Sequence, residues 1–170
     1  MDLGTLPQWI TAGIAGAAGI IAICAIRTQR DIARKRAAVD VFIKTEMDDK
    51  MIAAYDAFHA GLNEMRNAKS IAEFCTSETT SQHYFAIRKY LNIHELIAVG
   101  IHKRVLDEDV CHRYWCDILT TGYREAKPVF DYVRSRPKNR HTYVDLEALN
   151  TKWLNRDLAK RGFWRRASNN

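Results

Sequence analysis

A run of 24 uncharged residues from Leu3 to Ile26 constrains this chain more than any other feature. As a helix the run would extend about 36 Å at roughly 1.5 Å per residue, and the hydrocarbon core of a bilayer is about 30 Å thick. Trp9 lies near its start, where an amphipathic ring suits the level of the lipid headgroups. The run therefore predicts a single transmembrane helix within residues 1–26.

The charges that flank this run predict its orientation. Only Asp2 and the chain's amino group precede it, whereas five cations follow it against one anion, Asp31. These cations, here called the basic collar, are Arg27, Arg30, Arg34, Lys35 and Arg36. The positive-inside rule then puts the N-terminus outside and the rest of the chain in the cytoplasm, which in a bacterium means the inner membrane. The alternatives are a cleaved signal peptide, which has its cations before the apolar run, and a buried helix, which is seldom uncharged for so long.

Small residues dominate the second part of the run, because nine of the sixteen residues between Thr11 and Ile26 are Ala or Gly. They recur at four-residue spacing, which lets helix backbones approach closely within lipid. The residues that we expect at such a contact are Ala12, Gly13, Ala15, Gly16 and Gly19. The pattern predicts packing against another transmembrane helix, of a second copy or a partner subunit, although Ala and Gly are common in any such helix.

The net charge of +6 is concentrated at the two ends of the part that follows the run. Besides the collar, residues 152–166 carry six cations against one anion, and Arg165 and Arg166 are among them. The aromatic residues in this stretch are Trp153, Phe163 and Trp164. Mixed aromatic and basic residues suit an anionic lipid surface, which we expect as a partner. A protein partner or a solvated helix end is the alternative, and nucleic acid is the least favoured because the domain body is slightly acidic.

The rest of the chain has few helix breakers and no period-two pattern, so we expect an all-α protein with a small cytoplasmic helical bundle. Residues 27–66 should form a basic juxtamembrane region and a long helix, residues 67–162 the helical domain, and residues 163–170 a basic and polar tail. The apolar face of the long helix should be formed by Ile32, Ile43, Met47, Ala54, Phe58 and Met65. The four cysteines show no paired framework.

Local signals divide the domain into helices. Ser70 begins a short helix with a capping-box pattern, and a strongly apolar helix covers residues 82–103. Asp107 suits the N-cap of the next helix, which Pro128 ends or restarts. The last helix covers residues 142–161 and Gly162 should end it. The side chains that it should turn inward are Tyr143, Leu146, Leu149 and Trp153.

The helix over residues 82–103 carries one narrow polar stripe, here called the polar seam. Its residues are Arg88, Asn92, Glu95 and His102. If the seam is buried its charges must be paired, and Arg88 could reach Glu95 through Asn92. The seam is then a network that fixes helix packing, or a ligand site; if it is exposed, it is the solvent face of the helix.

Residues that could carry chemistry are few. His112 and Cys116, four residues apart, could bind a metal ion if Cys111 or His94 joined them. There is no CxxC pair, HExxH motif, P-loop or nucleophile elbow. We therefore predict no catalytic residues, no metal site and no cofactor.

Several stretches carry a resemblance to a known family. They are Tyr90 to Ile101, Leu106-Asp107-Glu108 and Trp115, with further matches at Pro128, Arg134, Leu149 and Trp153. Over roughly residues 40–155 the chain resembles the bacterial and phage proteins grouped as domain of unknown function 4760. The resemblance implies one N-terminal transmembrane helix with a helical cytoplasmic part, and it implies no activity.

These observations favour a non-enzymatic, membrane-anchored interaction module, an accessory or assembly subunit of a membrane complex or a homo-oligomer. The alternative is a membrane-tethered regulator or effector of phage or defence origin. Its cytoplasmic domain would sense a ligand through the polar seam.

Overall fold

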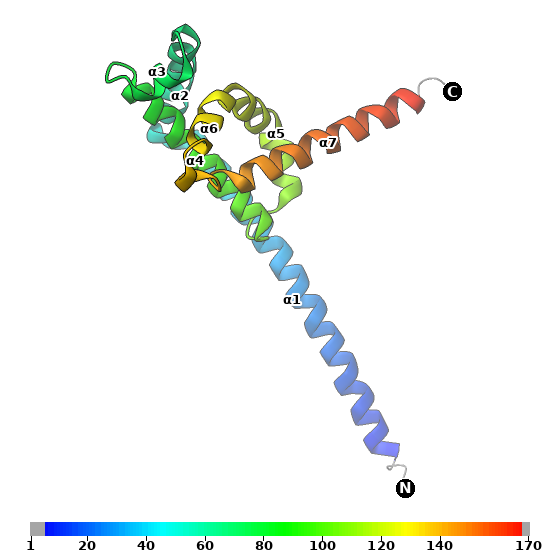
Figure 1. Ribbon diagram of the computed structural model, residues 1–170. Coiled ribbons are helices and arrows are strands. Elements are labelled where there is room, and N and C mark those ends of the chain that lie inside the picture. Colours follow the sequence, from blue (N-terminus) through cyan, green and yellow to red (C-terminus); the bar gives the residue numbers. More distant parts are fainter. Residues whose placement is uncertain (1–5, 168–170) are drawn as a thin grey trace.

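The computed structural model describes the backbone of residues 6–167 and the side chains of residues 8–156. Within those residues the chain is all-α, as predicted, and contains no strand. The helices are α1 (Leu6–Met47), α2 (Asp49–Asn67), α3 (Ile71–Thr76), α4 (Ser81–His102), α5 (Glu108–Glu125), α6 (Lys127–Arg134), the short 3₁₀ helix η1 (Pro137–Asn139) and α7 (Val144–Ala167). Figure 1 shows α1 and α7 extending in different directions from a body formed by the other helices.

Helix α1 continues from the apolar run through the basic collar and joins the body only near its end. Every described residue between Gln8 and Arg30 is exposed. Beyond the collar, Ala38 and Phe42 are buried, and the Phe42 ring stacks on Tyr114 with 4.6 Å between ring centroids. The spacing of Ala38 and Phe42, one helical turn apart, sets the face of α1 that meets α5.

The predicted apolar face of this region is wrong in its first half. Ile32, Ile43 and Met47 are 55%, 51% and 77% exposed, whereas Ala54 and Phe58 are buried as expected. The prediction assumed one unbroken helical period. The helix is interrupted at Asp48, so the phase of the pattern changes there.

Asp48 ends α1 and caps α2 without a glycine or a proline. Its backbone is extended (φ −93°, ψ 112°), and its Oδ1 atom accepts a hydrogen bond from the backbone N–H of Lys50 at 2.8 Å. A carboxylate at this position satisfies one of the free N–H groups of the first turn. After the break α2 runs along α4, and these two helices form the most extensive helix pair of the body.

Gly61 lets α2 and α4 pack closely. A Cβ atom at this position would lie 2.9 Å from the carbonyl oxygen of His83 and 3.0 Å from Cγ1 of Ile87. Helix α4 also packs against α3, α5, α6 and α7, which makes it the central helix of the body. Its buried side chains include Ile87, Leu91, Ala98 and Ile101, whereas two large apolar side chains of the same helix, Phe85 and Leu96, are exposed.

The later helices begin where their caps predict. Asp107 Oδ1 accepts from the backbone N–H of Val110 at 3.0 Å, and Pro128 lies in the first turn of α6, so it restarts a helix. The four inward side chains expected near the last helix are all buried; they are Tyr143, Leu146, Leu149 and Trp153.

Helix α7 does not end at Gly162 but continues to Ala167. A single interior glycine costs about 1 kcal/mol of helix propensity, and the flanking Ala, Lys and Arg residues favour the helix. Five residues of the predicted polar tail, 163–167, are therefore helical, and residues 168–170 lie outside the described part.

Candidate functional site

The structure places the polar seam against the first turn of α7. The two carboxylate oxygens of Glu95 accept hydrogen bonds from the backbone N–H groups of Leu146 at 2.7 Å and of Asp145 at 3.4 Å. His102 Nδ1 lies 2.6 Å from Asp145 Oδ1. The first N–H groups of a helix have no partner within the helix, so the Glu95 carboxylate of α4 caps α7. Its negative charge also interacts favourably with the positive end of the α7 dipole.

The other half of the seam makes different contacts. Asn92 is exposed, and Arg88 is half-buried with its guanidinium 5.8 Å from the Tyr84 ring centroid. The hydroxyl of Tyr143 donates to the Arg88 carbonyl oxygen at 3.5 Å. Among the described residues no ion pair joins Arg88 to Glu95. The Glu95 carboxylate binds the backbone of α7 instead of the predicted arginine partner. Glu95, His102 and the backbone of Arg88 therefore connect α4 to the start of α7, whereas Asn92 lies on the solvent side.

A second set of contacts, which the sequence analysis missed, fixes the same end of α7. Arg134 Nε donates to the Thr142 carbonyl oxygen at 2.8 Å, and its Nη1 donates to Glu147 Oε2 at 2.6 Å. The hydroxyl of Tyr123 donates to Glu147 Oε1 at 3.2 Å. The Arg134 guanidinium holds the pKa of the Glu147 carboxyl below its usual value. Arg134 was singled out in the sequence only through the family resemblance.

Tyr143, the residue before α7, has a positive φ of 62° although it is not glycine. Such a conformation costs on the order of 1–3 kcal/mol and persists where surrounding contacts impose it. The buried Tyr143 ring packs 5.3 Å from that of Phe130. These contacts hold the start of α7 tightly, and the charged residues there, Glu95, Arg134 and Glu147, stabilise the packing of α7 on the body.

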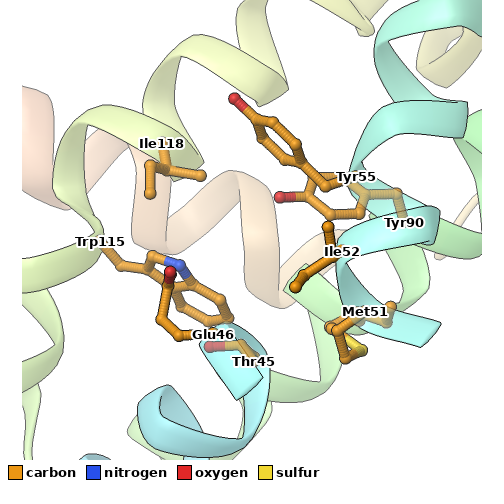
Figure 2. Close-up of a pocket in the computed structure, with 9 residues that line it drawn as sticks. Thr45, Glu46, Met51, Ile52, Tyr55, Tyr90, Trp115 and Ile118 are labelled. Atoms are coloured by element: carbon orange, nitrogen blue, oxygen red, sulfur yellow. The ribbon is translucent and has the colours of Figure 1, made fainter. Parts of the chain in front are cut away.

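A pocket lined by aromatic side chains and one carboxylate lies at the junction of α1 and α2. Its volume is about 430 Å³, and side chains from α1, α2, α4 and α5 surround it (Figure 2). The lining residues are Thr45, Glu46, Met51, Ile52, Tyr55, Tyr90, Ile93, Trp115 and Ile118. The pocket lies beside the break at Asp48, where α1 meets the body.

The chemistry of this pocket favours a small organic cation over an anion. Glu46 is its one charged side chain, and Tyr55, Tyr90 and Trp115 supply aromatic rings. Glu46 Oε1 accepts a hydrogen bond from the hydroxyl of Tyr114 at 2.7 Å, which fixes the carboxylate. Burial raises the pKa of Tyr90 to about 12, so the phenol is neutral at pH 7. A carboxylate among aromatic rings is the arrangement that attracts ammonium groups.

Directly behind the pocket lies His94, which is fully buried on α4. Its ring centroid is 4.5 Å from that of Tyr90 and 5.4 Å from that of Trp115. Neither ring nitrogen has a hydrogen-bond partner among the described residues. Burial lowers the pKa of His94 to about 4, so the imidazole is neutral at pH 7. The sequence pattern suggested His94 only as a possible metal ligand, whereas the structure shows a core residue.

The residues considered for a metal site are not brought together. Cys111 is buried, and burial raises the pKa of its thiol to about 12. The ring of His112 packs edge-on against Trp153 with 5.2 Å between centroids. Within the part of the chain that the structure describes, no three His, Cys, Asp or Glu side chains form a cluster that could hold a metal ion.

The small residues of α1 that were predicted to pack against another transmembrane helix contact no other part of the described chain. A Cβ atom at Gly13, Gly16 or Gly19 would meet no other atom within 4 Å, and Ala12 and Ala15 are exposed. In the collar Arg34 is half-buried and the other four cations are exposed. The side chains of Arg165 and Arg166 lie outside the described residues.

Within the described residues, α1 is the one helix long and apolar enough to cross a membrane, with a mean hydropathy of 2.1 in its apolar window. None of that window is buried against the body, which distinguishes it from a core helix. A signal sequence near the N-terminus meets the same criterion of length and composition.

Comparison with known proteins identifies the family. A family model described as a domain of unknown function (DUF4760) matches residues 12–153, and the chain therefore belongs to this family. The match begins inside the apolar run, so the family pattern includes part of the candidate membrane helix. No curated protein and no solved structure matches the chain.

Proposed function

We propose that this member of the DUF4760 family is a membrane-anchored, non-enzymatic interaction module, an accessory or assembly subunit of a membrane complex or a homo-oligomer. Helix α1 crosses the membrane and packs there against a second transmembrane helix. The helical body lies in the cytoplasm, at the inner membrane of a bacterium, and makes the remaining contacts. No catalytic step is part of this function.

One observation carries the proposal. The apolar part of α1 is exposed along its described length, and its small residues have open space around them. An apolar helix exposed to water would be unfavourable at about 25 cal/mol per Å². Lipid can cover the large side chains, whereas the flat surface at Gly13, Gly16 and Gly19 suits another helix backbone. The basic collar supports the cytoplasmic placement of the body.

A matched pair of substitutions tests the helix contact. Gly16→Leu adds bulk to the small-residue face, and Ala18→Leu adds bulk roughly 160° away at 100° per residue. Particle mass measured after mild detergent extraction should fall to that of a single chain for Gly16→Leu and stay unchanged for Ala18→Leu. Equal behaviour of the two variants would contradict a contact on this face.

A second candidate function, ligand sensing, is supported by the pocket at the junction of α1 and α2. Because the lining comes from both α1 and the body, a bound ligand would change or fix the angle between α1 and the body. Ligand sensing, which the sequence suggested for the polar seam, is thus proposed for this pocket instead, with Glu46 as the charged group that binds the ligand. A compact organic cation fits its carboxylate and aromatic rings.

Trp115 provides a direct readout for this second function, because its ring lines the pocket. Titrating the full chain with tetramethylammonium, as a probe, should change tryptophan fluorescence in the wild type. Glu46→Gln should weaken the response, and Glu78→Gln, an equal change of charge on an exposed turn, should not. An identical response of both variants would exclude recognition by Glu46.

A further inference from the structure

A groove lies between α1 and the turn that joins α4 to α5. Its volume is about 820 Å³. The collar cations Arg27, Arg30 and Arg34 line one side, and Lys103 and Arg104 from the turn line the other. Figure 1 shows the end of α4 lying beside α1 where α1 leaves the body. The groove thus brings together cations that are about 70 residues apart in the sequence.

The described lining of the groove carries far more positive than negative charge. Asp31 is its one acidic lining residue, and its carboxylate is held by Lys35, outside the groove, at 2.6 Å. Among the described residues, none forms an ion pair with Arg27, Arg30, Lys103 or Arg104. Like charges gathered in one concave surface repel each other and raise the local concentration of anions.

Arg34 is half-buried and lies between the groove and a neighbouring pocket that the acidic residues 107–109 line. Its Nε atom is buried and has no hydrogen-bond acceptor among the described residues. A buried guanidinium N–H without an acceptor is unfavourable. The arginines on both sides of the groove are exposed to it instead, and the planar fork of an arginine matches two oxygens of a phosphate.

The turn that carries Lys103 and Arg104 is held rigidly. The Gly100 carbonyl oxygen accepts from the backbone N–H groups of Val105 at 2.8 Å and Leu106 at 3.1 Å. Arg104 has a φ of 57°, the left-handed conformation in which glycine is usual after a helix. An arginine here accepts backbone strain that a glycine would avoid, and the hydrogen bonds of the turn maintain that conformation.

The level of the groove matches the lipid headgroups. Arg27 directly follows the apolar run, and residues 27–34 rise roughly 10 Å along the helix axis. The headgroup layer of one leaflet is about 5–8 Å thick. Val105, 59% exposed at the tip of the turn, adds an apolar side chain beside the cations.

We propose that this groove binds the phosphate of one anionic phospholipid, with the arginine side chains of α1 and of the turn around it. This inference rests on the proposed membrane placement of α1 and gives it a specific ligand. It differs from general attraction to a charged surface, because only the cations that line the groove take part.

The experiment measures lipid retention by native mass spectrometry of the full chain in a non-ionic detergent. Phosphatidylglycerol and phosphatidylcholine are the two probes. We expect one phosphatidylglycerol to be retained per chain, in preference to phosphatidylcholine. Arg30→Gln and Arg104→Gly should each lower the affinity for phosphatidylglycerol roughly fivefold to tenfold, because each cation near an anionic lipid contributes to binding by about that factor.

Arg36→Gln is the matched control, because it removes one charge from the same collar but lies roughly 180° from Arg27 around α1. It should change lipid affinity less than about twofold, the effect expected of a charge outside the site. Equal losses for Arg30→Gln and Arg36→Gln would overturn the groove as a site. Arg104→Gly should also leave the melting temperature unchanged or raised, so its loss of lipid cannot come from unfolding.

A third probe, inorganic phosphate, distinguishes a lipid from a free anion. If phosphate binds the lipid-free chain with the same dependence on Arg30 and Arg104, and phosphatidylglycerol does not displace it, the lipid assignment is overturned. Carbonate extraction of each variant separates this result from the proposed anchoring. Chains that resist extraction but retain no lipid refute the groove alone, whereas chains that are extracted refute the membrane placement itself.

Discussion

Replacing His94 with leucine should make the protein more resistant to mild acid. His94 is fully buried among Tyr90, Trp115 and Phe58, and neither ring nitrogen has a hydrogen-bond partner among the described residues. Protonation would place a charge in this apolar site, which is why burial lowers the pKa of His94 to about 4 from its ordinary 6.5.

The sign and the size of the effect follow from linkage. Between pH 6.5 and pH 4 the unfolded chain binds a proton at His94 that the folded chain does not. The contribution to stability is therefore fully present above pH 6.5 and is lost as the pH falls toward 4. From pH 7 to pH 4.5 the loss is about 2–3 kcal/mol, at roughly 1.4 kcal/mol per pKa unit. At roughly 2–4 °C per kcal/mol, Tm should fall by about 4–12 °C through His94 alone.

Thermal unfolding of the full chain in one mild detergent, followed by far-ultraviolet circular dichroism from pH 4.5 to pH 8, measures this effect. The difference in Tm between the wild type and His94→Leu removes the contribution of all other groups. His141→Leu, at an exposed position, serves as the control and should parallel the wild type. Parallel curves for the wild type and His94→Leu would refute the burial of a neutral imidazole.

Other perturbations test the packing of the body. Glu95→Ala should lower the free energy of unfolding by about 1–2 kcal/mol in chemical denaturation, because it removes the cap from the first turn of α7; no change would show that α7 needs no cap from α4. Gly61→Ala should destabilise by about 1–3 kcal/mol, because its Cβ would lie 2.9 Å from the His83 carbonyl oxygen. Gly122→Ala, whose Cβ would make ordinary contacts of 3.6 Å and beyond, should stabilise by about 1 kcal/mol through helix propensity. If Gly122→Ala melted at a lower temperature than Gly61→Ala, the close approach of α2 and α4 at Gly61 would be contradicted.

Features set by neighbours in the sequence could be predicted well. Asp107 and Pro128 begin helices because a capping carboxylate and a fixed φ act within one turn. Asp48 acts in the same way, but the apolar pattern continues on both sides of it. A capping residue inside a continuous pattern gives no clear break, so the exposure of Ile32 and Met47 could not be foreseen.

The candidate sites depend on contacts that no local pattern contains. Glu95 was identified as part of a polar stripe, yet its partner is the backbone of Leu146, 51 residues later. The pocket beside Glu46 needs four helices, and the basic groove needs the turn at Arg104 to lie against the collar. His94 is ambiguous in sequence, because histidine occurs both in cores and on surfaces.

The central claim is that α1 anchors the protein in a membrane and packs there against another transmembrane helix. The most direct test extracts the full chain from its native membranes under mild conditions and measures the mass of the particle that carries it. We predict a particle that contains at least one further membrane-spanning chain, a second copy or a partner subunit. A lone 19.6 kDa chain, whether in a detergent micelle or in the soluble fraction, would contradict the claim.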